Sequence, residues 1–183
     1  MIGTSSLRRR AQLLNFNPDL EIVDIRGNID TRIKKLAESK ELSGIILAEA
    51  GISRLGLNIN YQSLESDIIL PAMNQGNLAA QFKEDRTELA QLIKSITPEA
   101  TKICFETERE VIRRLEADCS SAVGVLAEIE KDLIRLECRV YALDGVEALS
   151  EKGEAQFDHG SQLAASIADK LLAGGAKELL HNK

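Results

Sequence analysis

The sequence has 183 residues, of which 44% are apolar and 28% are charged, proportions that are typical of a folded globular chain of one or two domains. A net charge of −6, with no Trp, two Tyr and four Phe, provides neither the basic excess nor the stacking side chains of a nucleic-acid-binding protein. No apolar run approaches the ~18 residues that a membrane-spanning helix needs, so we expect neither nucleic acid nor a membrane as a partner.

Helices and strands alternate through residues 1–70, which we expect to form an α/β unit with a mainly parallel sheet. Thr4-Ser5-Ser6 provides N-cap residues for the first helix, which should end before Pro18 because the residue preceding a proline disfavours helix. A β-branched run and a continuous apolar run are typical of buried parallel strands. The predicted elements are a helix over 7–16, a strand over 20–25, a helix over 29–37, a strand over 44–48 and a short helix that ends near 56.

Residues 71–97 are predicted to be a segment that connects two units. Residues 68–71 and 78–83 are short strand candidates on either side of the turn-rich tetrapeptide Asn74-Gln75-Gly76-Asn77. Residues 88–96 have the apolar spacing of a helix. The pattern thus predicts two short strands joined by a turn and followed by a helix.

Residues 98–183 are predicted to form a smaller α+β domain with an antiparallel sheet and helices. A helix that begins at Thr97-Pro98 and runs to about residue 115 leads into a loop that contains Cys119. Apolar residues alternate over 133–143, which is typical of a strand with one wet face, and Asp144-Gly145 is a hairpin turn signal. The remaining predicted elements are a strand over 125–129 and a helix that begins at Ser161 and ends at Gly174-Gly175.

The three cysteines, Cys104, Cys119 and Cys138, lack the CxxC or metal-type spacing of a zinc site. An odd number of cysteines, without a signal peptide at the start of the sequence, favours free thiols in a reducing compartment. We therefore expect a cytoplasmic protein without a metal site. Cys138 lies on the predicted core face of a strand and Cys104 lies among helical residues, so both are expected to be packing residues. Cys119 is predicted in a loop, where its thiol is either unremarkable or reactive.

Basic residues cluster in residues 1–60, which have 9 Lys and Arg against 7 Asp and Glu, whereas residues 61–183 have 14 against 22. Several arginines are predicted at helix starts, where a cation is unfavourable for the helix dipole. An anion held by guanidinium groups and free backbone N–H groups at the carboxyl ends of parallel strands would compensate this cost. The alternative is ordinary solvated charge, as we expect for Arg10, Lys34 and Lys35. The candidate anion-binding residues are Arg8, Arg9, Arg26, Arg32 and Arg54.

Five motifs occur along the chain. They are GTSSLRR at 3–9, DIRGNIDTR at 24–32, ILAEAGISRLG at 46–56, LPAMNQG at 70–76 and EADC at 116–119. In order and spacing these motifs resemble those of the porphobilinogen deaminase (hydroxymethylbilane synthase) family. The resemblance extends over most of the chain, which makes it far more specific than any one motif.

The resemblance implies a transferase that condenses four porphobilinogen units, with loss of ammonia, on a dipyrromethane primer to give hydroxymethylbilane for tetrapyrrole (haem or chlorophyll) biosynthesis. Porphobilinogen carries acetate and propionate arms, so the growing polypyrrole is a polyanion that arginine side chains would hold. Cys119 would anchor the dipyrromethane cofactor through a thioether. The residues implied for cofactor binding are Cys119, Arg8, Arg9, Arg26, Arg32, Ser6 and Thr4, and those implied for substrate binding are Arg8, Arg26, Arg32, Arg54 and Gln75.

The sequence departs from the family's pattern in several respects, among them residues 120–124, where the family more often has a proline. Ala117-Asp118 precedes the cysteine where the family has Gly-Gly, and Asn74 stands where the fourth motif has a glycine. The family's acid/base aspartate lies in an S-M-K-D motif of an N-terminal domain, and no part of the 183 residues matches that motif. We therefore expect no catalytic acid/base residue in this chain, no turnover by this chain alone, and an N-terminal domain as the missing packing partner of residues 71–97. A monomer is expected, and the plastid stroma stays open as an alternative location.

Two other interpretations stay open. The two-lobed α/β arrangement also resembles periplasmic binding domains. The first unit is accordingly expected to have the fold of one lobe of a periplasmic binding protein. The chain would then be a non-catalytic carboxylate- or anion-binding module, or a degenerate fragment. Alternatively, the chain would complete a separately encoded first domain. A covalent dipyrrole on Cys119 would distinguish the enzyme from the binding module.

Overall fold

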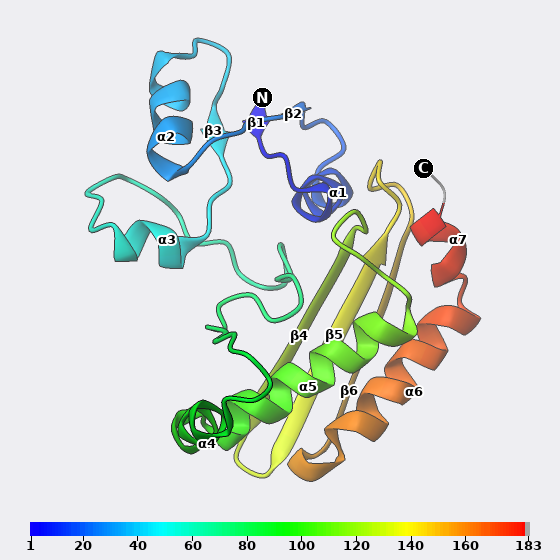
Figure 1. Ribbon diagram of the computed structural model, residues 1–183. Coiled ribbons are helices and arrows are strands. Elements are labelled where there is room, and N and C mark those ends of the chain that lie inside the picture. The colour runs from blue at the N-terminus through cyan, green and yellow to red at the C-terminus, as the bar shows by residue number, and fades with distance from the viewer. Residues whose placement is uncertain (182–183) are drawn as a thin grey trace.

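The first sheet is parallel and lies in the N-terminal part of the computed structural model, which describes residues 1–181 (Figure 1). Its strand order is β2-β1-β3, with Ile2 opposite Ile22 on one side and Gly44 on the other. Each strand leads into a helix, which confirms an α/β unit with a parallel sheet. The elements are β1 (Ile2–Gly3), α1 (Leu7–Phe16), β2 (Ile22–Val23), α2 (Ile29–Glu38), β3 (Gly44–Ile45) and α3 (Glu49–Arg54).

Local side-chain hydrogen bonds set the starts of the first two helices. Ser6 caps α1 by accepting from the backbone N of Arg9 (3.4 Å), and Asn28 caps α2 by accepting from the backbone N of Thr31 (2.8 Å). α1 ends before Pro18, as the sequence predicts. The strands are shorter than predicted, and β1 has too few residues for a sequence period to reveal it.

Between α3 and α4 (Thr87–Ile96) the chain forms neither helix nor strand. The predictions of strands over 68–71 and 78–83 are therefore wrong. The backbone N and O of Leu70 bond to the side chain of Gln12 instead of to a neighbouring strand. Residues 78–83 are exposed throughout, and within residues 1–181 no strand pairs with them. A short apolar run becomes a strand only where a neighbouring strand forms hydrogen bonds with its backbone N–H and C=O groups.

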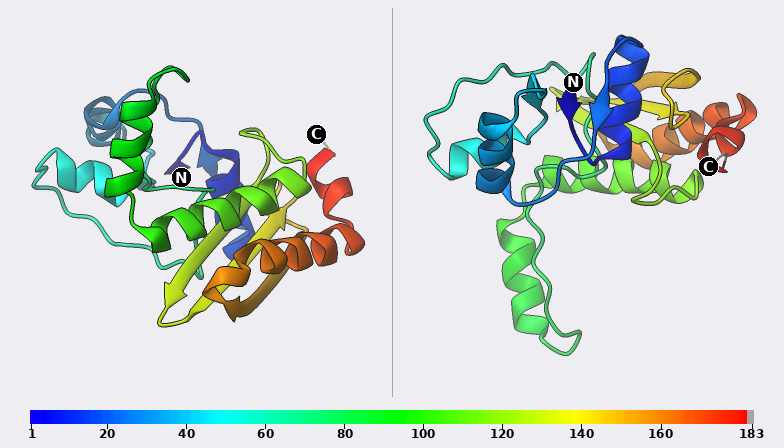
Figure 2. Two further views of the ribbon diagram at one scale, coloured as in Figure 1. Left: turned by 60° about the horizontal axis from the view of Figure 1, so that its bottom comes forward. Right: turned by 90° about the horizontal axis from the view of Figure 1, so that it is seen from above.

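The helix α4 confirms the prediction over 88–96, and it projects away from the rest of the molecule (Figure 2). None of its ten residues is buried, and Leu92 and Ile96 are 55% and 67% exposed. In the segment before α4, Leu78 is 84% exposed. The connecting segment therefore presents large apolar side chains to solvent.

An antiparallel sheet in the order β4-β5-β6 and two long helices form the second unit, which confirms the predicted α+β domain. Figure 1 shows α5 and α6 side by side across one face of this sheet. The sequence prediction lacks β6, because this strand has few large apolar residues. The elements are α5 (Glu99–Arg114), β4 (Val123–Glu130), β5 (Leu133–Tyr141), β6 (Ala148–Gln156), a 3-10 turn (Phe157–His159), α6 (Gly160–Ala173) and α7 (Ala176–His181). No helix in the described residues is both long and apolar enough to cross a bilayer.

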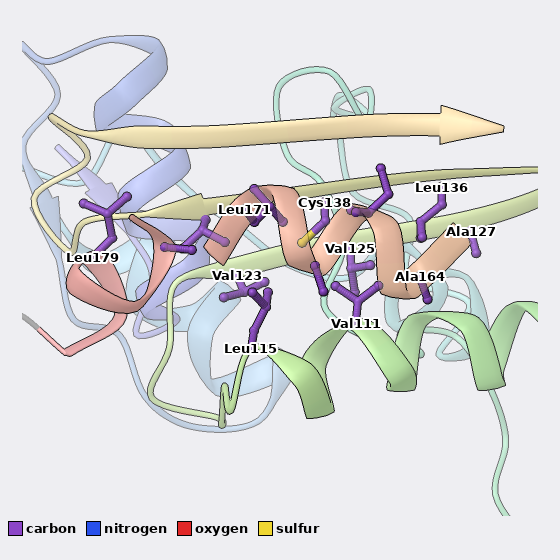
Figure 3. Packing of buried hydrophobic residues seen from close by; sticks show 14 of the residues in the cluster. Val111, Leu115, Val123, Val125, Ala127, Leu136, Cys138, Ala164, Leu171 and Leu179 are labelled. Atoms are coloured by element: carbon purple, nitrogen blue, oxygen red, sulfur yellow. The ribbon is translucent and has the colours of Figure 1, made fainter. Parts of the chain in front are cut away.

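The main hydrophobic core lies between this sheet and the helices α5 and α6 (Figure 3). Val125 and Cys138 of the sheet meet Val111 of α5 and Leu171 of α6, and each of the four is at most 1% exposed. Burial raises the pKa of the Cys138 thiol, which keeps it protonated and unreactive. Cys104 is half-buried and packs against the same core. The structure therefore confirms that these two cysteines are packing residues.

The helix α1 joins the two units. Ala11 of α1 forms a small buried cluster with Ala122, which immediately precedes β4, and with Tyr141 at the end of β5. Across the same junction, Nδ2 of Asn15 donates to the backbone O of Gly145 (2.9 Å). The arginine-bearing helix is therefore held against the end of the loop between α5 and β4.

Candidate functional site

Arg8 is the most buried of the predicted site arginines, with 7% exposure. One terminal guanidinium nitrogen donates to the backbone O of Leu70, and the other donates to Oε1 of Gln75 (3.0 Å). Burial, and then the charge of Arg9, lower the pKa of Arg8 to about 10, so the side chain is still a cation at neutral pH. Because both acceptors are neutral oxygens, they hold the guanidinium in place without cancelling its charge.

Arg9 and Arg32 extend this positive charge. Nη1 of Arg9 donates to the backbone O of Ile46 (3.0 Å), and Nε of Arg32 donates to the backbone O of Gly27 (2.7 Å). Burial, and then the charge of Arg32, lower the pKa of Arg9. Arg8, Arg9 and Arg32 therefore form one positively charged group that comes from two helices.

A cavity of about 640 Å³ opens beside Arg8 and Arg9, and Gln75 also lines it. Residues 43–48, which include β3 and the residues that follow it, form one wall, and residues 59–64 form another. The wall on the β3 side is largely apolar. Arg8 and Arg9, in the first turn of α1, supply positive charge on another side. Such a cavity suits a ligand that combines an apolar body with anionic groups.

Of the five predicted arginines, Arg8 and Arg9 line this cavity, whereas Arg26, Arg32 and Arg54 do not. Arg26 lies in the turn before α2, where its side chain is 84% exposed and lies 3.8 Å from the carboxylate of Asp24. Arg54 is the exposed last residue of α3. The short helix predicted to end near residue 56 contains Arg54 in its last turn, so this arginine does not share the helix-start position of Arg8 and Arg9. A cation at a helix C-terminus is favourable for the dipole, so the position of Arg54 requires no bound anion.

Thr4 and Ser6 lie at the N-terminus of α1. Oγ1 of Thr4, which is buried, accepts from the backbone N of Ser6 (3.3 Å), and Oγ of Ser6 accepts from the backbone N of Arg9 (3.4 Å). These bonds fix the start of the helix that carries the site arginines. A direct role of the two hydroxyls in ligand binding stays a prediction.

Cys119 lies in the loop between α5 and β4, and its thiol is free and exposed. The residue of this loop in the left-handed region is Glu116 (φ 54°), whereas Ala117 and Asp118 have no positive φ. Glycine is therefore not required at 117 and 118 for this backbone conformation. The loop fits a covalent attachment at its sulfur, because nothing in its geometry buries the thiol.

Asp118 adds a carboxylate next to the thiol-bearing residue. Its Oδ1 accepts from the backbone N and the Oγ of Ser120 (2.8 and 2.6 Å) and from the Oγ of Ser121 (3.2 Å). These donors turn the carboxylate toward the following serines. Asp118 thus contributes to the shape of the loop as well as to its charge.

Two buried polar side chains that support the site are missing from the sequence prediction. Gln12 is 1% exposed, and its amide pairs with both backbone groups of Leu70 (2.8 and 3.1 Å). Glu108 is 6% exposed and accepts from the backbone N of Asn74 and of Ala127. The only sequence signal for such residues is a polar side chain on the apolar face of a helix, and this signal does not identify the partner.

The geometry defines a two-unit α/β and α+β protein with an arginine-lined cavity in the first unit and an exposed loop thiol in the second. Residues 1–91 match the sequence profile described as "Porphobilinogen deaminase, dipyromethane cofactor binding domain". Residues 102–173 match "Porphobilinogen deaminase, C-terminal domain". The chain therefore belongs to the porphobilinogen deaminase family, whose cofactor is dipyrromethane.

Curated relatives agree with the two profiles. The porphobilinogen deaminases of Desulforamulus reducens and Campylobacter hominis are each 40% identical to this chain, over 180 and 182 residues. That of Carboxydothermus hydrogenoformans is 37% identical over 180 residues. Each alignment covers 98% of this chain and 58% of the relative. The chain thus spans a little under three-fifths of the length of these relatives.

Proposed function

We propose that the chain is the carboxylate-holding and primer-bearing part of a hydroxymethylbilane synthase, a transferase that condenses porphobilinogen with loss of ammonia. The observation that carries the proposal is the position of α1. This helix brings Arg8 and Arg9 to the cavity and packs, through Ala11, on Ala122. Ala122 is three residues from Cys119. A carboxylate clamp and a nucleophilic sulfur therefore belong to adjacent elements.

The arginines would bind and orient the carboxylate arms of the pyrrole rings. A guanidinium grips a carboxylate through parallel N–H groups, which fixes the direction of the ring as well as its place. Leu70 O and Gln75 Oε1 hold Arg8 before any ligand arrives, so little further ordering is needed on binding. Clamping the arms leaves the reacting ring carbon and the aminomethyl group free, which places them for condensation.

Cys119 would load the primer by the same type of reaction that extends the chain. The thiolate is the reactive form of cysteine. Its sulfur forms a bond to the aminomethyl carbon of porphobilinogen while the C–N bond breaks, and the amine leaves as ammonia with the thiol proton. Thr4, Ser6, Arg26 and Arg54 are proposed contacts for the carboxylates of a longer bound chain.

The covalent attachment gives the first test. Prolonged incubation with porphobilinogen is expected to raise the intact mass of the protein by a dipyrrole on Cys119, and peptide mapping locates the added mass. Cys119→Ser is expected to show no increase. Cys104→Ser is the matched control, because it alters a half-buried thiol outside the loop and should retain the adduct. An unmodified wild-type protein would favour the non-catalytic anion-binding module instead.

Repeated turnover by residues 1–183 alone is not expected. Fast, repeated condensation needs an acid/base group, and the sequence contains no S-M-K-D motif to supply the family's aspartate, so only slow loading of the primer is expected. Release of hydroxymethylbilane, followed as porphyrin absorbance after oxidation, should therefore be absent. The Desulforamulus reducens relative, assayed in parallel, is the positive control. A rate close to that of the relative would contradict this expectation, and activity restored by an added, separately expressed N-terminal domain would support a complementing role.

The proposed setting is a reducing compartment such as the cytoplasm, and the proposed state is a monomer. Cys104, Cys119 and Cys138 are all free in the structure. The thiol of Cys119 must be reduced to act as a nucleophile, and the plastid stroma meets the same requirement.

A further inference from the structure

Glu108 is a buried carboxylate that the proposed chemistry does not use. It lies in α5, and each of its oxygens accepts a backbone N–H: Oε2 from Asn74 (2.6 Å) and Oε1 from Ala127 (2.9 Å). Burial raises the pKa of Glu108, and these two hydrogen bonds act in the opposite direction. Burying a carboxylate costs free energy that hydrogen bonds only partly offset, so its position calls for a reason beyond packing.

The N–H of Asn74 belongs to a strap, which we define as residues 70–76. On one side the strap is bonded to α1. The Gln12 amide pairs with the backbone of Leu70, and Arg8 donates both to Leu70 O and to Oε1 of Gln75. The strap therefore supplies both acceptors that hold the guanidinium of Arg8.

On its other side the strap is bonded to the second unit. The backbone O of Pro71 accepts from the N of Val125 (2.9 Å), and Asn74 bonds to Glu108. Asn74 has a left-handed backbone (φ 58°), which asparagine tolerates. In the amide orientation that satisfies its neighbours, its side-chain nitrogen also donates to Glu108 Oε2 and to Phe105 O, both at 3.3 Å. Glu108 thus holds the backbone and the side chain of one strap residue.

We infer that Glu108 is a positioning residue for Arg8, acting through Asn74 and Gln75. The carboxylate fixes Asn74, and this sets the place of the next residue, Gln75, whose Oε1 accepts from Arg8. The inference rests on the proposed function, in which Arg8 binds a carboxylate of porphobilinogen. It joins the unit that carries Cys119 to the arginine cavity through a chain of hydrogen bonds.

Binding of porphobilinogen tests the inference, measured by calorimetry in a Cys119→Ser background that prevents covalent attachment. In Glu108→Gln one oxygen becomes an amide NH2 that faces a backbone N–H, so one of the two bonds is lost. We expect about tenfold weaker binding, the size of one charge-assisted hydrogen bond. Glu110→Gln is the matched control on the same helix, since that carboxylate pairs with Arg113 and Arg114 at the surface, and it should leave the affinity unchanged.

A double-mutant cycle distinguishes positioning from a general loss of structure. Gln75→Ala removes the link between the strap and Arg8. In that background Glu108→Gln is expected to add less than about a twofold further loss, because the route to Arg8 is already cut. The same loss in both backgrounds, or no loss in the parent protein, would overturn the inference.

A ligand-free measurement separates this inference from the proposed function. Failure of porphobilinogen to bind the parent protein would refute the proposed function, while the side-chain N–H resonances of Arg8 would still report on the strap. These resonances are expected to be sharp and slowly exchanging in the parent protein and in Glu110→Gln, and broadened in Glu108→Gln. Identical Arg8 resonances in all three proteins would overturn the positioning role.

Discussion

The Gly145→Ala substitution is expected to lower the free energy of unfolding by about 3 kcal/mol or more. Gly145 lies in the turn between β5 and β6 with a φ of +76°, which a residue with a Cβ rarely adopts. An added Cβ would lie 2.5 Å from the backbone O of Ala11 and 2.8 Å from the backbone N of Asn15. Because both atoms belong to the backbone of α1, no side-chain rotation relieves the overlap. The strain therefore falls on the junction between the two units.

Gly56 provides a matched control for this prediction. It also has a positive φ (+60°), but an added Cβ there would meet nothing within 4 Å. Gly56→Ala should therefore cost only the conformational term, about 1 kcal/mol. Urea unfolding followed by circular dichroism measures both variants. Equal losses in the two would mean that the contact between α1 and the hairpin contributes nothing to stability.

The Arg8→Lys substitution is expected to weaken porphobilinogen binding by about tenfold or more, measured in the Cys119→Ser background. The Arg8 guanidinium donates to Leu70 O and to Gln75 Oε1 while it lines the cavity. A lysine ammonium is a compact charge without a planar fork, so it cannot keep both bonds and present a paired donor to a carboxylate. The substitution retains the positive charge, so the loss reports geometry rather than net charge.

Arg10→Lys is the control for this second prediction. Arg10 is on the same helix, but its guanidinium reaches only the backbone O of Ile22 at 3.5 Å and does not line the cavity. Its substitution is expected to change the affinity by less than about twofold. Similar losses for Arg8→Lys and Arg10→Lys would contradict a specific carboxylate contact at Arg8.

The sequence predicts best those parts of the fold that depend on near neighbours. Ser6 and Asn28 cap the helices that they precede, and Pro18 marks the end of α1. The alternation over 133–143 identifies β5, and it also places Cys138 on the buried face. The caps and the proline act within a few positions, and in β5 the alternation itself marks the face that β4, α5 and α6 cover.

Local sequence patterns do not predict the parts of the fold that depend on partners distant in the sequence. The backbone of Leu70 is satisfied by Gln12, 58 positions away, so an apolar run that has the pattern of a strand is part of the strap instead. Ala148–Gln156 is a strand because β5 pairs with it, although its own composition gives a weak signal.

The same distinction applies to the candidate site. The motifs correctly indicate that Arg8, Arg9 and Arg32 come together, because each follows a strand of one parallel sheet. They do not indicate Glu108, whose two backbone partners are 34 and 19 positions away. Arg54 shows the opposite case: its motif is present, but the helix that contains it ends at that residue and the arginine does not line the cavity.

The helix α4 has a consequence for how the molecule holds together. A ten-residue helix without buried residues gains almost no free energy from tertiary packing and is marginal in water. The covalent path from the first unit to the second runs through this weak element, whereas the strap and α1 join the units by partly buried hydrogen bonds and apolar contact. A break in the peptide chain at α4 would therefore leave two pieces that stay associated as one particle.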